Sequence, residues 1–392
     1  MPEYDYLIVG GGMTADAAVK GIRQMQAAET IGIIAREGHP PYNRPPLSKG
    51  LWKGDSVTSI FRRTEEKNVT MHLSCTAVSL DPERRIVTDN LGTTYTYGKL
   101  LLATGGKVKR LPFDAEGIIY YRTLDDFERL RALCAKGKSF AVIGGGFIGS
   151  EIAAALAMND ASVTMIFPGD GIGSNIYPPR LSYFLNTYFG ARGVQILAHE
   201  SAAAIERIDA RYRVTTSRGT VLEVDAVVAG IGIEPNTDLA EAAGLEVNNG
   251  IVVDEFLRTS HPGIYAAGDA ANFYSAALDK RIRVEHEDNA ASMGETAGFN
   301  MTGIGVSYRH LPFFYSDLFD LGYEAIGELN AKHEIVEEWK EEFKEGVIYY
   351  LNASRVRGVL LWNTWGRVDE ARRLIAEKGP FNAKTLRRIP LS

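Results

Sequence analysis

The chain has 392 residues, of which 45% are hydrophobic and 23% charged, a balance typical of a globular protein with several hydrophobic cores. Its formal net charge of −6 gives no basic footprint for binding nucleic acid. No apolar run approaches the ~20 residues that cross a bilayer, and no basic-then-apolar leader opens the chain, so we expect a cytoplasmic protein without a membrane span.

The N-terminal region predicts a strand, a glycine turn and a helix, in that order. Residues 5–9 are apolar after Asp5, as in a buried parallel strand, and residues 15–26 have helical composition. Between them, Gly10, Gly12 and Ala15 fit the three positions of a dinucleotide fingerprint, whose third position only sets helix packing and tolerates alanine. Such a turn lets the backbone approach a pyrophosphate, and the helix N-terminus adds unpaired N–H groups. An ordinary glycine-rich turn is the alternative interpretation.

A second strand is expected at residues 31–35, and Glu37 follows it. An acid at this position of the fold usually binds the adenosine ribose, and a surface glutamate in a turn is the alternative. Residues 69–103 alternate between apolar and polar and contain turn residues, so we expect strands there that end in a glycine turn at Gly105.

A proline-rich loop, residues 41–49, holds two cations in fixed positions. Arg44 and Lys49 are either solvated charges on a rigid turn, or an arginine that meets phosphate and a lysine that reaches a redox ring. This loop is the most specific short segment of the sequence.

The order of strand, glycine turn and helix recurs in the middle of the chain. Residues 139–143 predict a strand and residues 149–158 an alanine-rich helix. The three fingerprint positions are here all glycine: Gly144, Gly146 and Gly149. Two such loops suggest two nucleotides bound side by side and electron transfer between them. The next predicted strand, residues 162–167, has no acid at its end, although Asp170 is close, so the choice between NAD and NADP stays open.

The last part of the chain changes character at about residue 306. It becomes richer in aromatic residues and aliphatic strands, and it predicts a small α+β domain that ends in a helix at residues 368–378. Residues 334–345 are dense in acids, which we interpret as a solvated charged face rather than an acidic docking site.

Motifs spread over nearly the whole chain carry a family resemblance. They are residues 44–49, 101–106, 144–151, 267–271, 283–286, 322–327 and 361–363. With these motifs the chain resembles the FAD-dependent pyridine nucleotide reductase superfamily, in particular the ferredoxin and rubredoxin reductases and most closely the apoptosis-inducing factor family. The resemblance implies an α/β fold with two Rossmann-like domains of the glutathione-reductase type and a small α+β C-terminal domain. It implies an FAD-binding domain over residues 1–112 and 235–305, an NAD(P)H-binding domain over 113–234 and the C-terminal domain over 306–392.

The resemblance also implies site residues. FAD is implied to lie on the first glycine loop, in contact with Gly10, Gly12, Ala15, Glu37, Arg44, Lys49, Ala77, Thr104, Gly105, Arg110, Gly268 and Asp269. NAD(P)H is implied to lie on the second loop, in contact with Gly145, Gly146, Phe147, Ile148 and Gly232. The residues matched to the junction of nicotinamide and flavin are Glu285, His286, Glu324 and Asn363.

Lys49 and Glu151 match a pair beside the reactive flavin nitrogen and are the implied catalytic residues. Hydride transfer adds negative charge to the flavin ring, which a fixed cation stabilises in a dry site while the carboxylate holds the cation. Phe147 either covers the flavin face until the nucleotide displaces it, or is a core aromatic residue at the start of a helix.

Some positions depart from the pattern of the apoptosis-inducing factor family. Tyr315 replaces a tryptophan and offers less area for stacking on a ring. An acid, a lysine and a second histidine of the relatives are replaced by Gly169, Asn175 and Glu287. These departures leave the nucleotide preference and the stability of a charge-transfer complex open.

We therefore expect an oxidoreductase that passes a hydride from NAD(P)H, with NADH favoured, to FAD and then electrons to a small iron–sulfur protein or a quinone. Arg281 and Arg283 form no dense basic cluster, which weighs against an acidic ferredoxin. The alternative is a slow-turnover, redox-gated binding protein of the apoptosis-inducing-factor type. A homodimer is a further possible assembly of the chain. Cys75 and Cys134 form no CxxC pair, which disfavours a disulfide reductase.

Overall fold

The computed structural model describes residues 1–26, 28–113, 115–386 and 388–391. Two compact units divide the chain. The first comprises Met1–Arg44, Ser56–Lys107 and Glu234–Phe313, and the second comprises Pro45–Asp55, Val108–Ile233 and Phe314–Ser392. The proline-rich loop therefore belongs, from Pro45 onward, to the second unit. The finer division into three domains stays a prediction.

A largely parallel sheet forms the centre of the first unit. Its order is β3 (Thr70–His72), β2 (Ile31–Ile34), β1 (Glu3–Val9), β6 (Thr94–Leu102), β5 (Ile86–Asp89) and β4 (Ala77–Asp81), and β18 (Ile264–Ala266) also pairs with β6. The strands β1, β2, β3, β6 and β18 are parallel, whereas β4 and β5 are antiparallel. The inner strands are apolar on both faces, as parallel strands covered by helices require.

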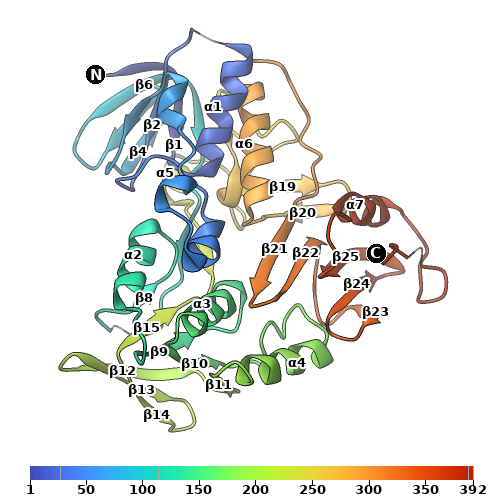
Figure 1. The fold of residues 1–392 in the computed structure, drawn as a ribbon. Helices are drawn as coiled ribbons and strands as arrows, with labels where there is room; N and C mark the ends of the chain where they lie inside the picture. The colour runs from blue at the N-terminus through green and yellow to red at the C-terminus, as the bar shows by residue number, and fades with distance from the viewer. Residues whose placement is uncertain (27, 114, 387, 392) are drawn as a thin grey trace. The chain divides into compact units, whose positions relative to one another are not determined.

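Two helices of this unit, α1 (Met13–Met25) and α6 (Glu287–Met301), pack closely side by side (Figure 1). Glycines allow the close approach, since a Cβ at Gly298 would collide with the carbonyl oxygen of Ala18, and one at Gly21 with that of Glu295. The remaining elements of the unit are α5 (Asp238–Ala242) and a small sheet of β17 (Ile251–Val252), β19 (Ala271–Ser275) and β20 (Lys280–Ile282).

The second unit contains another parallel sheet. Its order is β11 (Val194–Ala198), β10 (Ser162–Phe167), β9 (Ser139–Ile143), β15 (Ala226–Ala229) and β8 (Ile119–Tyr120). The helices that follow its strands are α2 (Leu124–Leu133), α3 (Phe147–Met158) and α4 (Pro179–Gly190). An antiparallel sheet of β12 (Ala202–Ile208), β13 (Arg211–Thr216) and β14 (Val221–Val224) extends from it. The strands β7 (Gly106–Val108) and β16 (Ile233–Pro235) pair with each other, and the boundaries between the two units fall within them. In both parallel sheets, the strand before the glycine loop lies next to a strand from later in the chain: β1 beside β6, and β9 beside β15. Open α/β sheets bind ligands at the carboxyl ends of strands at such a change in strand order.

An antiparallel sheet completes the second unit. Its order is β21 (Phe313–Leu318), β22 (Leu321–Gly327), β25 (Arg355–Trp362), β24 (Glu345–Asn352) and β23 (Glu334–Glu341), and α7 (Val368–Ala376) packs on β22 and β25 (Figure 1). Its core is aromatic, because Tyr323, Tyr349, Tyr350 and Trp362 are fully buried. These observations confirm the predicted class, two Rossmann-like folds and a C-terminal α+β region. Among the described residues, no helix combines the length and the apolar surface needed to span a membrane.

Candidate functional site

The two glycine loops have the same backbone geometry at their first position. Gly10 has φ +123° and Gly144 has φ +117°, values that favour glycine. A Cβ would also collide with a carbonyl oxygen of the neighbouring strand, that of Ala103 at Gly10 and that of Gly230 at Gly144. Each loop therefore requires glycine at this position for reasons internal to the chain.

The third glycine of each loop has a different environment. Gly12 caps α1 with φ −99° and ψ −166°, and Gly146 caps α3 with φ −85° and ψ −166°. Neither helix start is capped by a side chain, and a Cβ at either glycine would meet no described atom within 4 Å. The open space lies at helix N-termini whose first N–H groups need acceptors, so both loops fit a pyrophosphate.

The second loop lies beside the ends of β10 and β15. Gly145 lies against the end of β10, because a Cβ there would stand 2.8 Å from the ring of Phe167. Its carbonyl oxygen accepts the backbone N–H of Gly173 at 2.8 Å, so the segment after β10 folds over the loop. Ile148 is 39% exposed in the first turn of α3, and Gly232 follows β15 with φ +95°.

In the first unit, Glu37 and Arg44 form an ion pair after β2. The Tyr42 hydroxyl donates to the other oxygen of Glu37 at 2.6 Å and accepts from Arg44 at 3.2 Å. Burial raises the pKa of Glu37, but Arg44 and Tyr42 outweigh it and hold the pKa below its ordinary value. A carboxylate has about four acceptor positions, so Glu37 keeps capacity for ribose hydroxyls.

The predicted residues around β18 lie in the same unit. Asp269 interacts electrostatically with both Arg44 and His286. Arg283 donates to the Asp269 carbonyl oxygen at 3.1 Å and pairs with Glu285 at 2.6 Å. Burial lowers the pKa of His286 to about 4, against the opposing charges of Asp269 and of a second aspartate on α6.

Five further predicted FAD contacts belong to the first unit, and one does not. Thr104 and Gly105 are fixed by Asn236, which donates to the Thr104 carbonyl oxygen at 2.8 Å from its side chain and to that of Gly105 at 2.9 Å from its backbone. Ala15 is buried in α1, Gly268 has φ +76° beside Thr14, and Ala77 begins β4. Arg110 belongs to the second unit, where its guanidinium lies 4.9 Å from the ring centre of Tyr120.

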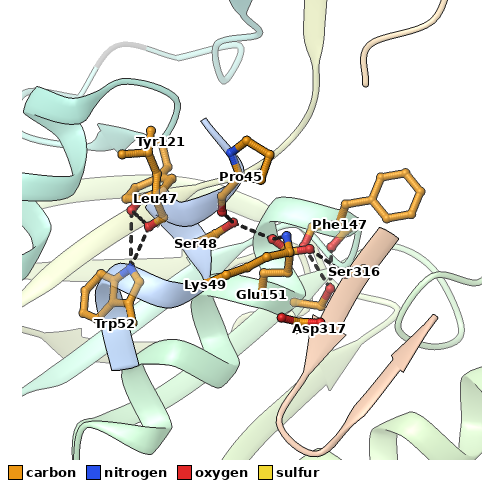
Figure 2. A network of polar contacts seen from close by, with 12 residues as sticks. Pro45, Leu47, Ser48, Lys49, Trp52, Tyr121, Phe147, Glu151, Ser316 and Asp317 are labelled. Carbon is orange, nitrogen blue, oxygen red and sulfur yellow. Dashed lines mark hydrogen bonds and ion pairs between the residues drawn. The ribbon is translucent and has the colours of Figure 1, made fainter. Parts of the chain in front are cut away.

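Lys49 and Glu151 form a buried ion pair in the second unit, with 2.7 Å between Nζ and Oε2 (Figure 2). The Ser48 hydroxyl donates to the same oxygen at 2.5 Å, and the Ser316 hydroxyl donates to Oε1 at 2.5 Å. The Glu151 side chain is 3% exposed and that of Lys49 11%. The carboxylate thus accepts from three donors that the chain supplies at residues 48–49 and 316.

The segment that carries Ser48 and Lys49 is two short 3-10 turns, Pro45–Ser48 and Gly50–Lys53. The Leu47 carbonyl oxygen accepts from Trp52 Nε1 at 2.8 Å and from the Tyr121 hydroxyl (Figure 2). Trp52 is buried and packs edge to face on Phe127 of α2, with ring centres 5.5 Å apart. This anchorage fixes the backbone from which Lys49 projects.

The other predicted residues of the second unit surround the pair or hold the C-terminal sheet. Lys49 Nζ lies 5.2 Å from the ring centre of Tyr315, and Phe147 packs on Phe314 at 5.0 Å. Asn363 accepts from the Gly322 backbone N–H at 2.7 Å and donates to the Lys344 carbonyl oxygen at 2.8 Å. Burial raises the pKa of Glu324, against the N–H that it accepts from Gly366.

Several residues of these sites were not predicted from the sequence. They are Ser48, Ser316, Trp52, Tyr121 and Tyr42. Ser48 lies inside a motif that carries the resemblance, and Ser316 directly follows an aromatic run. No sequence pattern around a serine shows that it will bind a distant carboxylate. The tyrosines and the tryptophan read as core residues, and they acquire their roles only through hydrogen bonds formed in the fold.

Two glycine loops of matching backbone geometry, each after a strand of its own parallel sheet, are the arrangement typical of oxidoreductases built on two nucleotide-binding folds. The chain belongs to the pyridine nucleotide-disulphide oxidoreductase family, whose sequence model matches residues 4–294. The model of the C-terminal domain of apoptosis-inducing factor, mitochondrion-associated, matches residues 328–377.

Individual relatives agree with this family. The chain is 33% identical to the mitochondrial apoptosis-inducing factor 1 of Dictyostelium discoideum, over 96% of this chain and 79% of that protein. It is 34% identical to the ferredoxin reductase subunit of 5,5'-dehydrodivanillate O-demethylase from Sphingobium sp., over 91% of this chain and 89% of the subunit. Putidaredoxin reductase, solved in a covalent complex with putidaredoxin, superposes with a TM-score of 0.90 at 28% identity, over 98% of this chain and 96% of that chain.

Proposed function

We propose that the chain is an NAD(P)H-dependent flavoprotein reductase, with FAD at the first glycine loop and the nicotinamide dinucleotide at the second. The observation that carries the proposal is the matched pair of open helix caps, Gly12 and Gly146, behind the strained glycines Gly10 and Gly144. One nucleotide would need a single such loop. The names of the relatives, which are ferredoxin reductases, support the reaction.

The chain's own residues have defined tasks in this reaction. Bound FAD supplies a ring that accepts two electrons together and releases them singly. Glu151 holds the Lys49 ammonium in place, so that a fixed positive charge meets the negative charge that develops on the ring. Because the pair is almost fully buried, little water screens this charge. Arg44, held by Glu37, is placed to bind a phosphate of the dinucleotide.

NADH is the proposed nucleotide. A 2′-phosphate on the adenosine ribose needs an arginine or a lysine near the end of the second strand of the fold. Residues 162–175, from β10 into the segment that folds over Gly145, contain neither. Asp170 lies in this segment, 3.4 Å from His199, and a carboxylate repels a phosphate. Residual use of NADPH is expected to be weak.

A small iron–sulfur protein of the ferredoxin type is the proposed electron acceptor. The relatives named as ferredoxin, rubredoxin or putidaredoxin reductases support this partner, and a quinone is the alternative acceptor. The cytoplasmic location expected from the sequence stays a prediction, as does a homodimer.

Steady-state turnover tests the proposal. With NADH, we expect rapid reduction of a ferredoxin or of a quinone, and with NADPH a kcat/KM at least tenfold lower. Negligible turnover with a panel of ferredoxins, rubredoxins and quinones would contradict the enzymatic function.

A second function is favoured by the C-terminal match to apoptosis-inducing factor over residues 328–377. In this alternative the protein turns over slowly, and its nucleotide-reduced state changes its oligomer or its partner surface. Light scattering before and after addition of NADH separates the two functions. A change in mass with negligible turnover supports the alternative, whereas rapid turnover at constant mass supports the reductase.

A further inference from the structure

The Glu151 carboxylate is held asymmetrically. Ser48 and Lys49 both contact Oε2, and they are consecutive residues at the junction of the two short 3-10 turns. Ser316 contacts Oε1, and it comes from β21 of the C-terminal sheet, 165 residues further along the chain. Figure 2 shows the three donors converging on the carboxylate from these separate segments.

The contact to Oε1 determines the orientation of the Glu151 carboxylate plane, and therefore the direction in which Oε2 points. A carboxylate is planar, and the last torsion of a glutamate side chain has a broad, two-fold energy profile. Two donors on a single oxygen leave the plane free to turn about that oxygen. A third donor on the other oxygen fixes the plane, and a hydrogen bond to a charged group is stronger than one between neutral groups.

Ser316 is itself supported from behind. It is 1% exposed, and its side chain interacts with the buried hydroxyl of Tyr323. The Tyr177 hydroxyl donates to the Tyr323 hydroxyl at 2.8 Å, while the Tyr323 ring stacks on Trp362 with ring centres 5.6 Å apart. Burial foremost raises the pKa of Tyr323 well above its ordinary value, so this hydroxyl stays protonated and neutral.

We propose that Ser316 is a positioning residue for the reductase reaction, which fixes the Glu151 carboxylate through Oε1 and thereby fixes the Lys49 ammonium. The inference rests on the proposed function and extends it to the C-terminal sheet. Through Ser316 this sheet controls how firmly the charge of Lys49 is held. Glu151 is the one side chain that links the two residues in this path.

Acylation of the Lys49 amine by acetic anhydride, followed by mass spectrometry, tests this inference on the purified protein. In Ser316→Ala we expect Lys49 to be acylated about tenfold faster than in the wild type, the lower range for loss of one hydrogen bond to a charged group. Lys138 is the internal reference, because its half-exposed side chain pairs with Asp225, away from Ser316 in the sequence, and its rate should not change. Ser316→Thr, which keeps the hydroxyl, should restore the wild-type rate.

Two variants serve as comparisons. Ser182→Ala removes another buried serine of the second unit, whose hydroxyl donates to the Ile172 carbonyl oxygen at 2.7 Å, and it should leave Lys49 unchanged. Ser48→Ala leaves the contact to Oε1 in place and should raise the rate less than Ser316→Ala. If Ser316→Ala fails to fold, Ser316→Cys decides, since a thiol is a weak donor of similar size.

Reduction of the flavin by NADH provides the second readout. In Ser316→Ala we expect the limiting rate of reduction to fall several-fold, with the NADH dissociation constant and the FAD content unchanged. Equal rates of Lys49 acylation in Ser316→Ala and Ser182→Ala would overturn the inference about Ser316. If NADH still reduced the flavin of the wild type, the proposed function would stand. A wild-type protein without flavin would instead overturn the proposed function, and the acylation comparison would remain valid.

Discussion

Asp16 shows at the scale of one residue how burial and charge act together. Its side chain is fully buried in the first turn of α1, and its oxygens meet Lys20, Arg62 and Lys67 at 2.7 to 2.9 Å. Thr64 donates a further hydrogen bond at 2.7 Å. Burial alone would raise the pKa of Asp16, but these partners hold it well below its ordinary value. The carboxylate therefore joins α1 to the segment before β3.

Asp16→Asn should destabilise the protein by about 3 kcal/mol or more, because it leaves a cluster of partly buried cations without their counter-charge. Chemical denaturation at pH 7 measures the change. Asp209→Asn, at an exposed turn, should change the free energy of unfolding by no more than about 0.5 kcal/mol. Equal effects of the two substitutions would show that the buried cluster contributes nothing.

His286 predicts a pH dependence. Its pKa is about 4 in the folded protein, against about 6.5 for an unperturbed histidine, so the unfolded chain binds more protons between these values. The contribution of His286 to stability is complete above about pH 6.5 and is lost as the pH falls towards 4. Thermal unfolding from pH 7 to pH 5 should therefore show a steeper loss in the wild type than in His286→Gln. Parallel curves would contradict the assignment.

At the scale of elements, each glycine loop contains one glycine that the fold itself requires and one that faces open space. Gly12 and Gly146 can accept a Cβ without a clash, so alanine there should cost less than about 1 kcal/mol of stability. The added methyl group would instead occupy the space of the pyrophosphate. Alanine at Gly10 or Gly144 should be far more damaging, because φ and the neighbouring carbonyl oxygen both oppose it.

Gly12→Ala and Gly146→Ala should therefore each weaken the binding of a different nucleotide. Gly146→Ala is expected to weaken NADH binding about tenfold, which is about 1.4 kcal/mol, at unchanged FAD content. Gly12→Ala is expected to lower FAD retention without changing NADH affinity in molecules that keep FAD. Gly190→Ala, at another glycine with open surroundings, is the control. If both loop variants lost the same nucleotide, the assignment of the two loops would be wrong.

The elements also show which parts of the fold local sequence can predict. The strands before both glycine loops, the helices after them and the hairpin of β13 and β14 follow from apolar patterns and turn residues. The packing of α1 on α6 does not follow, because its glycines matter only when two helices far apart in the sequence meet. The same holds for the 3-10 turns around Lys49, which depend on Trp52 and Tyr121.

At the scale of the whole molecule, repetition in the sequence predicted the architecture better than the site. The matched fingerprints indicated two nucleotide-binding folds, and both parallel sheets are present. The motifs that carry the family resemblance indicated Lys49 and Glu151 as site residues, and the structure shows that they form an ion pair. The donors that fix this pair, Ser48 and Ser316, have no local signal, because a hydrogen bond between residues 151 and 316 is a property of the folded chain.

An anaerobic titration of the purified protein with NADH, followed by visible absorbance, tests whether the chain is an NADH-dependent flavoprotein. We expect a yellow protein with bound FAD, whose flavin absorbance is bleached by a single equivalent of NADH per flavin and far less readily by NADPH. A colourless protein that gains no FAD on reconstitution, or a bound flavin that neither nucleotide reduces, would contradict this expectation.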